Sequence, residues 1–114
     1  EWIKQLGKSA VEYGARLIVD SSDNIYVTGF SSEFESDNEF GSQNTLLAKY
    51  DSSGTREWTK PLGSTLTDFA WDVTVDSTDN IYVTGFSENS FAQNISWQDD
   101  DILLMKFNTE GIKL

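Results

Sequence analysis

The run Asp99-Asp100-Asp101 is the densest group of side chains in the sequence that could bind a metal ion. Carboxylate oxygens are the ligands that calcium prefers, so a calcium site is one hypothesis for these three residues. The surrounding residues do not follow the pattern of an EF-hand loop, and short acidic runs are usually solvated loops. The solvated loop is therefore the favoured interpretation. No cofactor is expected, and calcium is the one ion that the sequence leaves open.

Two aromatic residues, Phe91 and Trp97, lie in the same polar segment. Large rings outside a regular strand are candidates for contact with a protein or a glycan. Trp2, Trp58 and Trp71 could also stack on sugars, but their positions in strand-like segments favour packing in the core or between sheets. Phe91 and Trp97 are therefore the predicted ligand contacts.

Catalytic chemistry finds little support in the residue types. The chain has no histidine and no cysteine, which excludes the Ser-His-Asp and Cys-His arrangements of nucleophilic catalysis. Acidic residues are abundant, so a pair of carboxylates that acts on a glycan remains an alternative. Nothing in the spacing brings two of them to one site. We expect a protein that is not an enzyme.

The charge balance restricts the partners. Lysine and arginine number 8 against 19 aspartate and glutamate, for a net charge of -11. Such an acidic surface repels nucleic acids and anionic membranes, so neither is an expected partner. No apolar run is long enough to cross a bilayer. No signal peptide is visible, but the chain starts at Glu1 without methionine, so this observation says nothing about targeting.

The sequence consists of two copies of one unit. The heptapeptide NIYVTGF at 24–30 returns unchanged at 80–86, and a shift of 56 aligns residues 1–30 with residues 57–86. The alignment moves by one residue after Phe86, and 45–56 then matches 102–113. The chain is thus interpreted as two tandem repeats, 1–56 and 57–114.

Each repeat has the pattern of four short strands. Isoleucine, valine, tyrosine, threonine and tryptophan dominate these segments, and polar turns at 21–24 and 51–54 separate them. No segment has the spacing of an amphipathic helix. The predicted strands are 15–20 and 71–76, 24–30 and 80–86, 45–50 and 102–107, and 57–61 with 1–5 as its counterpart. The chain is therefore predicted to be all-β.

The strand at 24–30 has small or apolar residues on both of its sides. Ile25, Val27 and Gly29 face one way. The other side has Tyr26, Thr28 and Phe30. A strand of this composition is covered on both faces rather than exposed on one. Sheets of four strands that stack between similar neighbours provide this environment.

These segments resemble a known family. VDSSDNIYVTGF, a variable connection and LLAKYDSSGTREWTKPLG together resemble the bacterial and archaeal seven-bladed β-propeller repeat, SBBP. The resemblance covers nearly the whole chain and occurs twice. It implies antiparallel four-stranded blades, a scaffold or binding role, and a place outside the cell or on the surface of a prokaryote. Asp23 and Asp79 stand where the family usually has glycine, and aspartate tolerates the left-handed backbone of such a turn.

The strand order implies that the blades continue beyond one chain. The first blade, 15–61, is complete, whereas the second, 71–107, lacks its fourth strand. The strand that should complete it lies at the N-terminus and comprises Glu1, Trp2, Ile3, Lys4 and Gln5. Propellers close with about four to eight blades, so two blades form part of a ring. Either further blades complete the ring, or three or four copies assemble by strand exchange.

The connections between the strands suggest where binding occurs. The segments at 31–44 and 87–101 differ between the repeats, while the strands are nearly the same, as expected of a scaffold with a variable binding face. We therefore expect a non-catalytic scaffold that recognises protein or glycan through two kinds of long connection, from the second strand to the third and from the fourth strand to the first strand of the next repeat. The alternatives are a structural element that assembles with copies of itself, and a propeller enzyme that acts on glycans.

Overall fold

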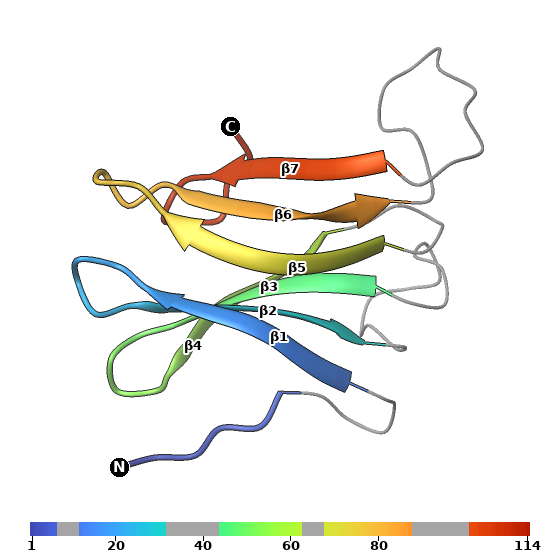
Figure 1. Cartoon of the computed structure of the whole chain (residues 1–114). Helices are drawn as coiled ribbons and strands as arrows, with labels where there is room; N and C mark the ends of the chain where they lie inside the picture. Colours follow the sequence, from blue (N-terminus) through green and yellow to red (C-terminus); the bar gives the residue numbers. More distant parts are fainter. Residues whose placement is uncertain (7–11, 32–43, 63–67, 88–100) are drawn as a thin grey trace.

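The computed structural model describes residues 1–6, 12–31, 44–62, 68–87 and 101–114, and these contain seven strands and no helix. The strands form two antiparallel sheets, β1-β2-β3-β4 and β5-β6-β7, which stack on each other (Figure 1). Their bounds are β1 Glu12–Val19, β2 Ile25–Ser31, β3 Asn44–Tyr50, β4 Arg56–Leu62, β5 Asp68–Val75, β6 Ile81–Ser87 and β7 Asp101–Phe107. The first sheet is called the first blade and the second sheet the second blade. The prediction of an all-β fold built from antiparallel blades is confirmed.

Seven of the predicted strands overlap the observed ones, with ends that differ by at most three residues. The eighth, at residues 1–5, is not a strand in the single chain. A strand needs a neighbour that accepts and donates its backbone hydrogen bonds, and no described strand pairs with this segment. Its pairing within a larger assembly stays a prediction.

The turns at one end of the blades share a single design. In the first, the Asp20 side chain accepts hydrogen bonds from the backbone N–H groups of Ser22 and Asn24, each at 2.9 Å. A side chain that bonds its own backbone in this way fixes a tight turn. The residues that play the part of Asp20 in the other turns are Asp51, Asp76 and Asn108. This end of the strands is called the turn end, and the opposite end the loop end.

Each turn also contains one residue with left-handed backbone. Asp23 and Asp79 have φ values of 62° and 61°, and Gly54 and Gly111 have φ values of 82° and 75°. Glycine adopts this conformation without steric cost, and aspartate is among the side chains that tolerate it best. The replacement of the usual glycine by aspartate is therefore compatible with the turn, as expected.

The main core lies between the blades. Tyr26 and Leu47 of the first blade are fully buried against Val73, Ile81 and Val83 of the second. β2 and β6 are the two copies of the heptapeptide, and they bury the side chains of opposite sides. The reason is that the second blade covers one face of the first blade, whereas the first blade covers the opposite face of the second. The prediction that this strand is covered on both faces is therefore met on one face in each blade.

Two glycines let the first two strands of each blade approach closely. A Cβ on Gly85 would collide with the carbonyl oxygen of Phe69, and Gly29 is placed in the same way beside Tyr13. Both contacts lie next to a β-bulge in the neighbouring strand. Glycine is required here because no side chain fits between the two backbones.

We predict that Gly85→Ala destabilises the fold by about 1–3 kcal/mol, as overpacking at a rigid backbone contact does. Gly14→Ala is the matched control, because a Cβ at Gly14 would meet no atom within 4 Å. Its effect should stay within about 0.5 kcal/mol. Urea unfolding followed by circular dichroism measures both, and equal losses would contradict the assignment of the contact.

Candidate functional site

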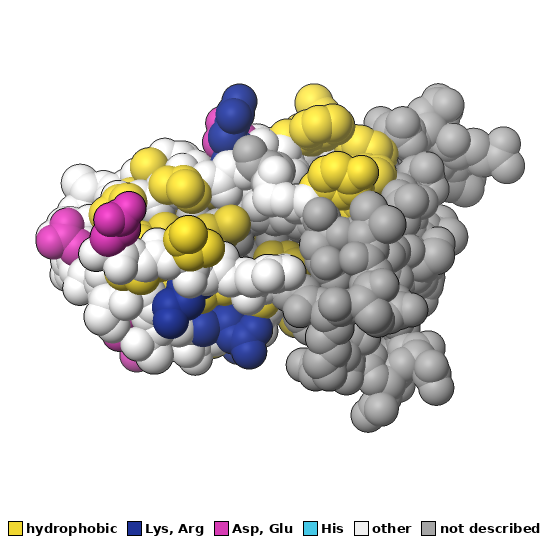
Figure 2. Space-filling view, turned by 90° about the horizontal axis from the view of Figure 1, so that it is seen from below, with side chains coloured by type: hydrophobic (Ala, Val, Ile, Leu, Met, Phe, Trp, Pro, Cys, Tyr) yellow, Lys and Arg dark blue, Asp and Glu magenta, His cyan; other side chains and the backbone are white. Residues whose placement is uncertain are grey.

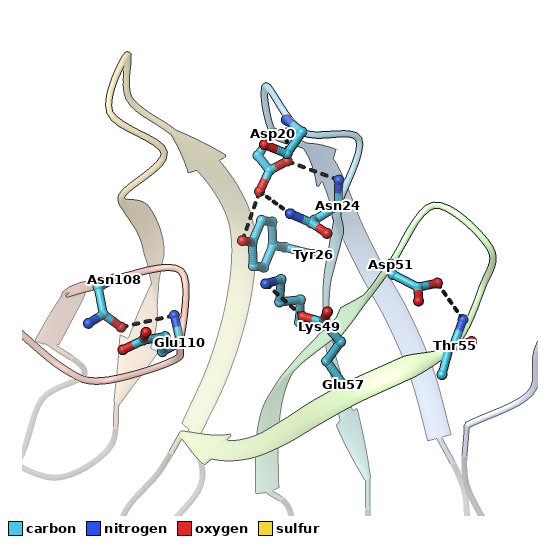
Figure 3. A network of polar contacts seen from close by, with 10 residues as sticks. Asp20, Asn24, Tyr26, Lys49, Asp51, Thr55, Glu57, Asn108 and Glu110 are labelled. Carbon is cyan, nitrogen blue, oxygen red and sulfur yellow. Dashed lines mark hydrogen bonds and ion pairs between the residues drawn. The ribbon is translucent and has the colours of Figure 1, made fainter.

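The acidic residues at the turn end are occupied by internal hydrogen bonds. The Asp20 carboxylate accepts from the Asn24 side chain at 2.9 Å and from the Tyr26 hydroxyl at 3.0 Å, in addition to its two backbone bonds (Figure 3). Asp76 accepts the equivalent bonds from Asn80 and Tyr82, each at 3.0 Å. Among the described residues, no three acidic side chains gather as a metal site would require. The turn aspartates Asp20 and Asp76 therefore hold the backbone of their turns.

The pKa values of these groups agree with a structural role. Burial raises the pKa of Asp20, but hydrogen bonds from Asn24, Ser22 and Tyr26 outweigh it and leave the pKa below its ordinary value. Burial, together with the bond to Asp20, raises the pKa of Tyr26 above its ordinary value. Both shifts favour the ionised aspartate and the protonated tyrosine. Neither group is poised to move a proton near neutral pH.

Lys49 is also held in place near this network. Its Nζ lies 2.7 Å from Oε2 of Glu57 and 5.9 Å from the centre of the Tyr26 ring (Figure 3). An ammonium group that is largely buried between a carboxylate and an aromatic ring packs the blade rather than offering itself to a ligand.

The turn aspartates predict how stability depends on acid. Hydrogen bonds from Asn80 lower the pKa of Asp76, and those from Ser53 lower the pKa of Asp51. A carboxyl group with a lowered folded pKa contributes stability above its unfolded pKa of about 3.9, and the contribution disappears as the pH falls through the folded pKa. We expect the urea midpoint to fall steeply below about pH 4.

The substitution Asp76→Asn should lower the urea midpoint at pH 7 and weaken its dependence on pH below about pH 4. The amide keeps one acceptor oxygen and loses the one that binds Asn80 and Tyr82. Glu110→Gln is the control at the same end, since its side chain is exposed. An unchanged acid dependence in Asp76→Asn would contradict the role given to this carboxylate.

Five aromatic rings form a continuous array at the loop end, and this array is called the aromatic rim. Tyr13 stacks on Phe30 at 4.9 Å between ring centres, and Phe30 meets Phe69 of the second blade edge-on at 5.2 Å. Phe69 lies 5.0 Å from Phe86, and the Trp71 ring lies 6.2 Å from Phe69 and 6.1 Å from Phe86. The rim therefore bridges the two blades where the long connections leave them.

Trp71 is the most prominent member of the aromatic rim. It is the extra residue of a β-bulge, because Ala70 pairs with Gly85 and Asp72 pairs with Thr84. Bulges redirect side chains and are frequent beside binding sites. The indole is 61% exposed although Phe69 and Phe86 support it. The sequence analysis expected Trp71 to pack in the core or between sheets. This expectation is wrong for most of the side chain, because most of its surface is exposed.

A comparison of the two repeats could have identified Trp71 as a candidate site residue from the sequence. The shift of 56 residues places Trp71 on Ala15, so the second blade carries a large ring where the first has a methyl group. A departure from the repeat at a strand position marks a residue that the blade does not need for its own packing. The bulge that exposes the ring involves pairing between strands, which the sequence does not show.

One ion pair joins the blades close to the aromatic rim. Nε of Arg16 on β1 lies 3.9 Å from Oδ1 of Asp72 on β5, and both side chains are mostly exposed. An exposed pair of this kind contributes about 0–1 kcal/mol to stability.

The residues that the sequence singled out belong to the second long connection and the start of β7. Phe91, Trp97, Asp99 and Asp100 fall outside the described residues, so their roles stay predictions. Asp101 is the first residue of β7 and pairs with Ser87 at the loop end of the second blade.

The comparison with protein families decides what kind of repeat this is. The family model SBBP, described as a β-propeller repeat, matches residues 1–33 and 57–92. Both matches begin at equivalent positions of the two repeats, and together they cover more than half of the chain. The chain belongs to the SBBP β-propeller repeat family. It is a propeller module of the scaffold and binding kind, as its resemblance implied.

A curated relative carries another repeat name. An uncharacterised WD repeat-containing protein of Acanthamoeba polyphaga mimivirus is 28% identical to this chain, over 74% of the chain and 8% of the relative. The chain therefore spans less than a tenth of the length of that protein. Within the described ranges, no helix is long and apolar enough to cross a membrane.

Proposed function

We propose that this SBBP module is a non-catalytic scaffold that recognises a partner protein through the loop end of its blades. The observation that carries the proposal is the aromatic rim, in which the Trp71 indole is mostly exposed on a support of two phenylalanine rings. The module would act outside the cell or on the cell surface, as its family resemblance implies.

The residue types at the loop end favour a protein as the partner. Tryptophan, tyrosine and arginine are the residues that most often dominate the energy of protein interfaces. Trp71, Tyr13 and Arg16 provide one of each on the neighbouring strands β1 and β5, and all three are exposed. Because Phe69 and Phe86 already pack against the Trp71 ring, the side chain loses little conformational entropy when a partner covers it.

The charge of the chain favours a particular kind of partner surface. A net charge of -11 attracts basic proteins at long range and accelerates their encounter. The connections at 31–44 and 87–101 carry acidic residues without any lysine or arginine. A partner with a basic surface around an apolar patch therefore matches both features of the loop end.

Glycan recognition is the second candidate, because an exposed tryptophan face also stacks on sugar rings. The same Trp71 indole would provide the platform. Phe91 and Trp97 are predicted to extend either kind of contact from the second long connection. The two candidates differ in what the purified chain should bind.

The test uses the chain as bait for a random peptide library displayed on phage and, in parallel, for a glycan array. We expect selected peptides with basic and apolar residues. Calorimetry with one such peptide should show that Trp71→Ala weakens binding by about 30-fold, the effect of losing an interface residue worth about 2 kcal/mol.

Ile112→Ala is the matched control, because Ile112 is an exposed apolar residue after the last turn at the turn end. It should leave peptide binding unchanged. Binding that survives Trp71→Ala would reject the aromatic rim as the site. Glycan signals that depend on Trp71, without any selected peptide, would replace the protein partner by a glycan.

A further inference from the structure

The backbone on either side of Trp71 is attached to the other blade. The N–H of Ala70 donates a buried hydrogen bond of 3.1 Å to Oγ1 of Thr45, which lies on β3 of the first blade. On the other side, Oδ1 of Asp72 lies 3.9 Å from Nε of Arg16 on β1. These two attachments join the bulge that exposes the indole to two strands of the first blade.

The hydrogen bond to Thr45 is the stronger of the two attachments. Thr45 is fully buried and Ala70 is 6% exposed, so water does not replace the bond when it breaks. The side chains of Arg16 and Asp72 are mostly exposed, and solvent screens an ion pair of this kind. Thr45 is therefore the main contact of the two that hold the backbone next to Trp71.

The bulge needs such a contact because its extra residue interrupts the pairing of the strands. Two residues of β5 stand opposite one residue of β6 at this point, and a bulge leaves backbone groups without their regular partners. A buried N–H group without an acceptor costs free energy, so the backbone would move to find one. The hydroxyl of Thr45 supplies an acceptor for Ala70 and keeps the bulge in the form in which Trp71 is exposed.

The rings that support Trp71 depend on the first blade as well. Phe69 stacks on the Trp71 ring and also meets Phe30 of the first blade edge-on, at 5.2 Å between ring centres. Figure 2 shows hydrophobic side chains exposed at the loop end, where Trp71 and Tyr13 are the most exposed rings of the aromatic rim. The surface that a partner would meet is thus built by both blades.

The strand pairing of a blade does not require a hydroxyl at the position of Thr45. The match of 45–56 with 102–113 places Thr45 on Ile102, and each of them pairs with the phenylalanine that ends the heptapeptide. An aliphatic side chain is therefore compatible with this strand. What distinguishes the threonine is the hydrogen bond that it accepts from the neighbouring blade.

We propose that Thr45 is the positioning residue for Trp71, so that two adjacent blades recognise the partner protein together. The indole that the partner covers belongs to the second blade, and the hydroxyl that fixes its backbone belongs to the first. This inference rests on the proposed recognition of a partner through the aromatic rim. It adds that the affinity depends on a residue that the partner does not touch, because Thr45 is fully buried.

Thr45→Val tests the proposal, because valine keeps the shape of threonine and removes the acceptor oxygen. We expect a peptide selected on the unaltered chain to bind this variant about five-fold more weakly, the equivalent of one lost hydrogen bond. Thr45→Ser restores the oxygen and should restore the affinity. Calorimetry with the same peptide measures all three chains.

Thr28→Val is the matched control. Thr28 is also a fully buried threonine of the first blade, but its hydroxyl donates to the carbonyl oxygen of Arg16 in the same blade, at 3.4 Å. This variant should be less stable in urea without any change in peptide affinity. Equal losses of affinity in Thr28→Val and Thr45→Val would mean a general structural effect and would overturn the proposal.

A second measurement follows the Trp71 ring without any peptide. The chain has four tryptophans, and after labelling with 5-fluorotryptophan the fluorine NMR signal that disappears in Trp71→Phe belongs to Trp71. Thr45→Val should shift or broaden this signal, and Thr45→Ser should restore it. The signals of Trp2 and Trp58 should stay in place, because both rings lie on turns at the turn end.

The outcomes separate this inference from the proposed function. Peptide binding that does not depend on Trp71 would reject both. Binding that depends on Trp71 but is unchanged in Thr45→Val would reject the positioning by Thr45 and leave the proposed function in place. A Trp71 fluorine signal that is the same in Thr45→Val as in the unaltered chain would also overturn the inference.

Discussion

The stacking of one blade on the next is the interaction on which the rest of the structure depends. Tyr26 and Leu47 pack on Val73, Ile81 and Val83, and this is the larger of the two clusters of buried hydrophobic residues in the part of the chain that the structure describes. Each blade is apolar on both of its faces because each is a copy of the same unit. A single blade would leave both faces in water, so a neighbour is a condition of stability rather than an addition to it.

The turns and the tryptophan contacts give that stacking its geometry. In each turn, the side-chain oxygen of an aspartate or asparagine accepts a hydrogen bond from a backbone N–H group four residues further on. These bonds fix the register of the strands on either side. Trp58 then rests on Gly111, which sets the position of one blade on the next, and Trp2 rests on Gly54 in the same way. Glycine suits these places because its left-handed backbone forms the turn and its missing side chain admits the indole.

The residues that differ between the two repeats are the candidates for function, because the residues that the repeats share are needed to form the blade. Trp71 replaces Ala15, and Asp72 replaces Arg16, on the two inner strands beside the long connections. Both differences leave the strands and the core unchanged. They alter what the loop end presents to a partner, which fits a scaffold that keeps its framework and varies its binding surface.

Local features of the sequence determined most of the fold. Residues of one strand alternate between two faces, and turn residues act within a few positions of each other, so NIYVTGF and the aspartate turns located seven strands to within three residues. The repeat of 56 or 57 residues then assigned the family. Of the predicted site, Phe91, Trp97, Asp99 and Asp100 lie outside the described residues and stay predictions, as do the pairing of residues 1–5 and the calcium hypothesis.

Only the tertiary structure decided which surfaces are covered. The same heptapeptide buries Tyr26 in one blade and Ile81 in the other, because burial depends on which face has a neighbour and not on the residue itself. The exposure of Trp71 depends on a bulge opposite Gly85, and the position of Trp2 depends on a turn more than fifty residues away. Such contacts join distant parts of the chain, so no local pattern records them.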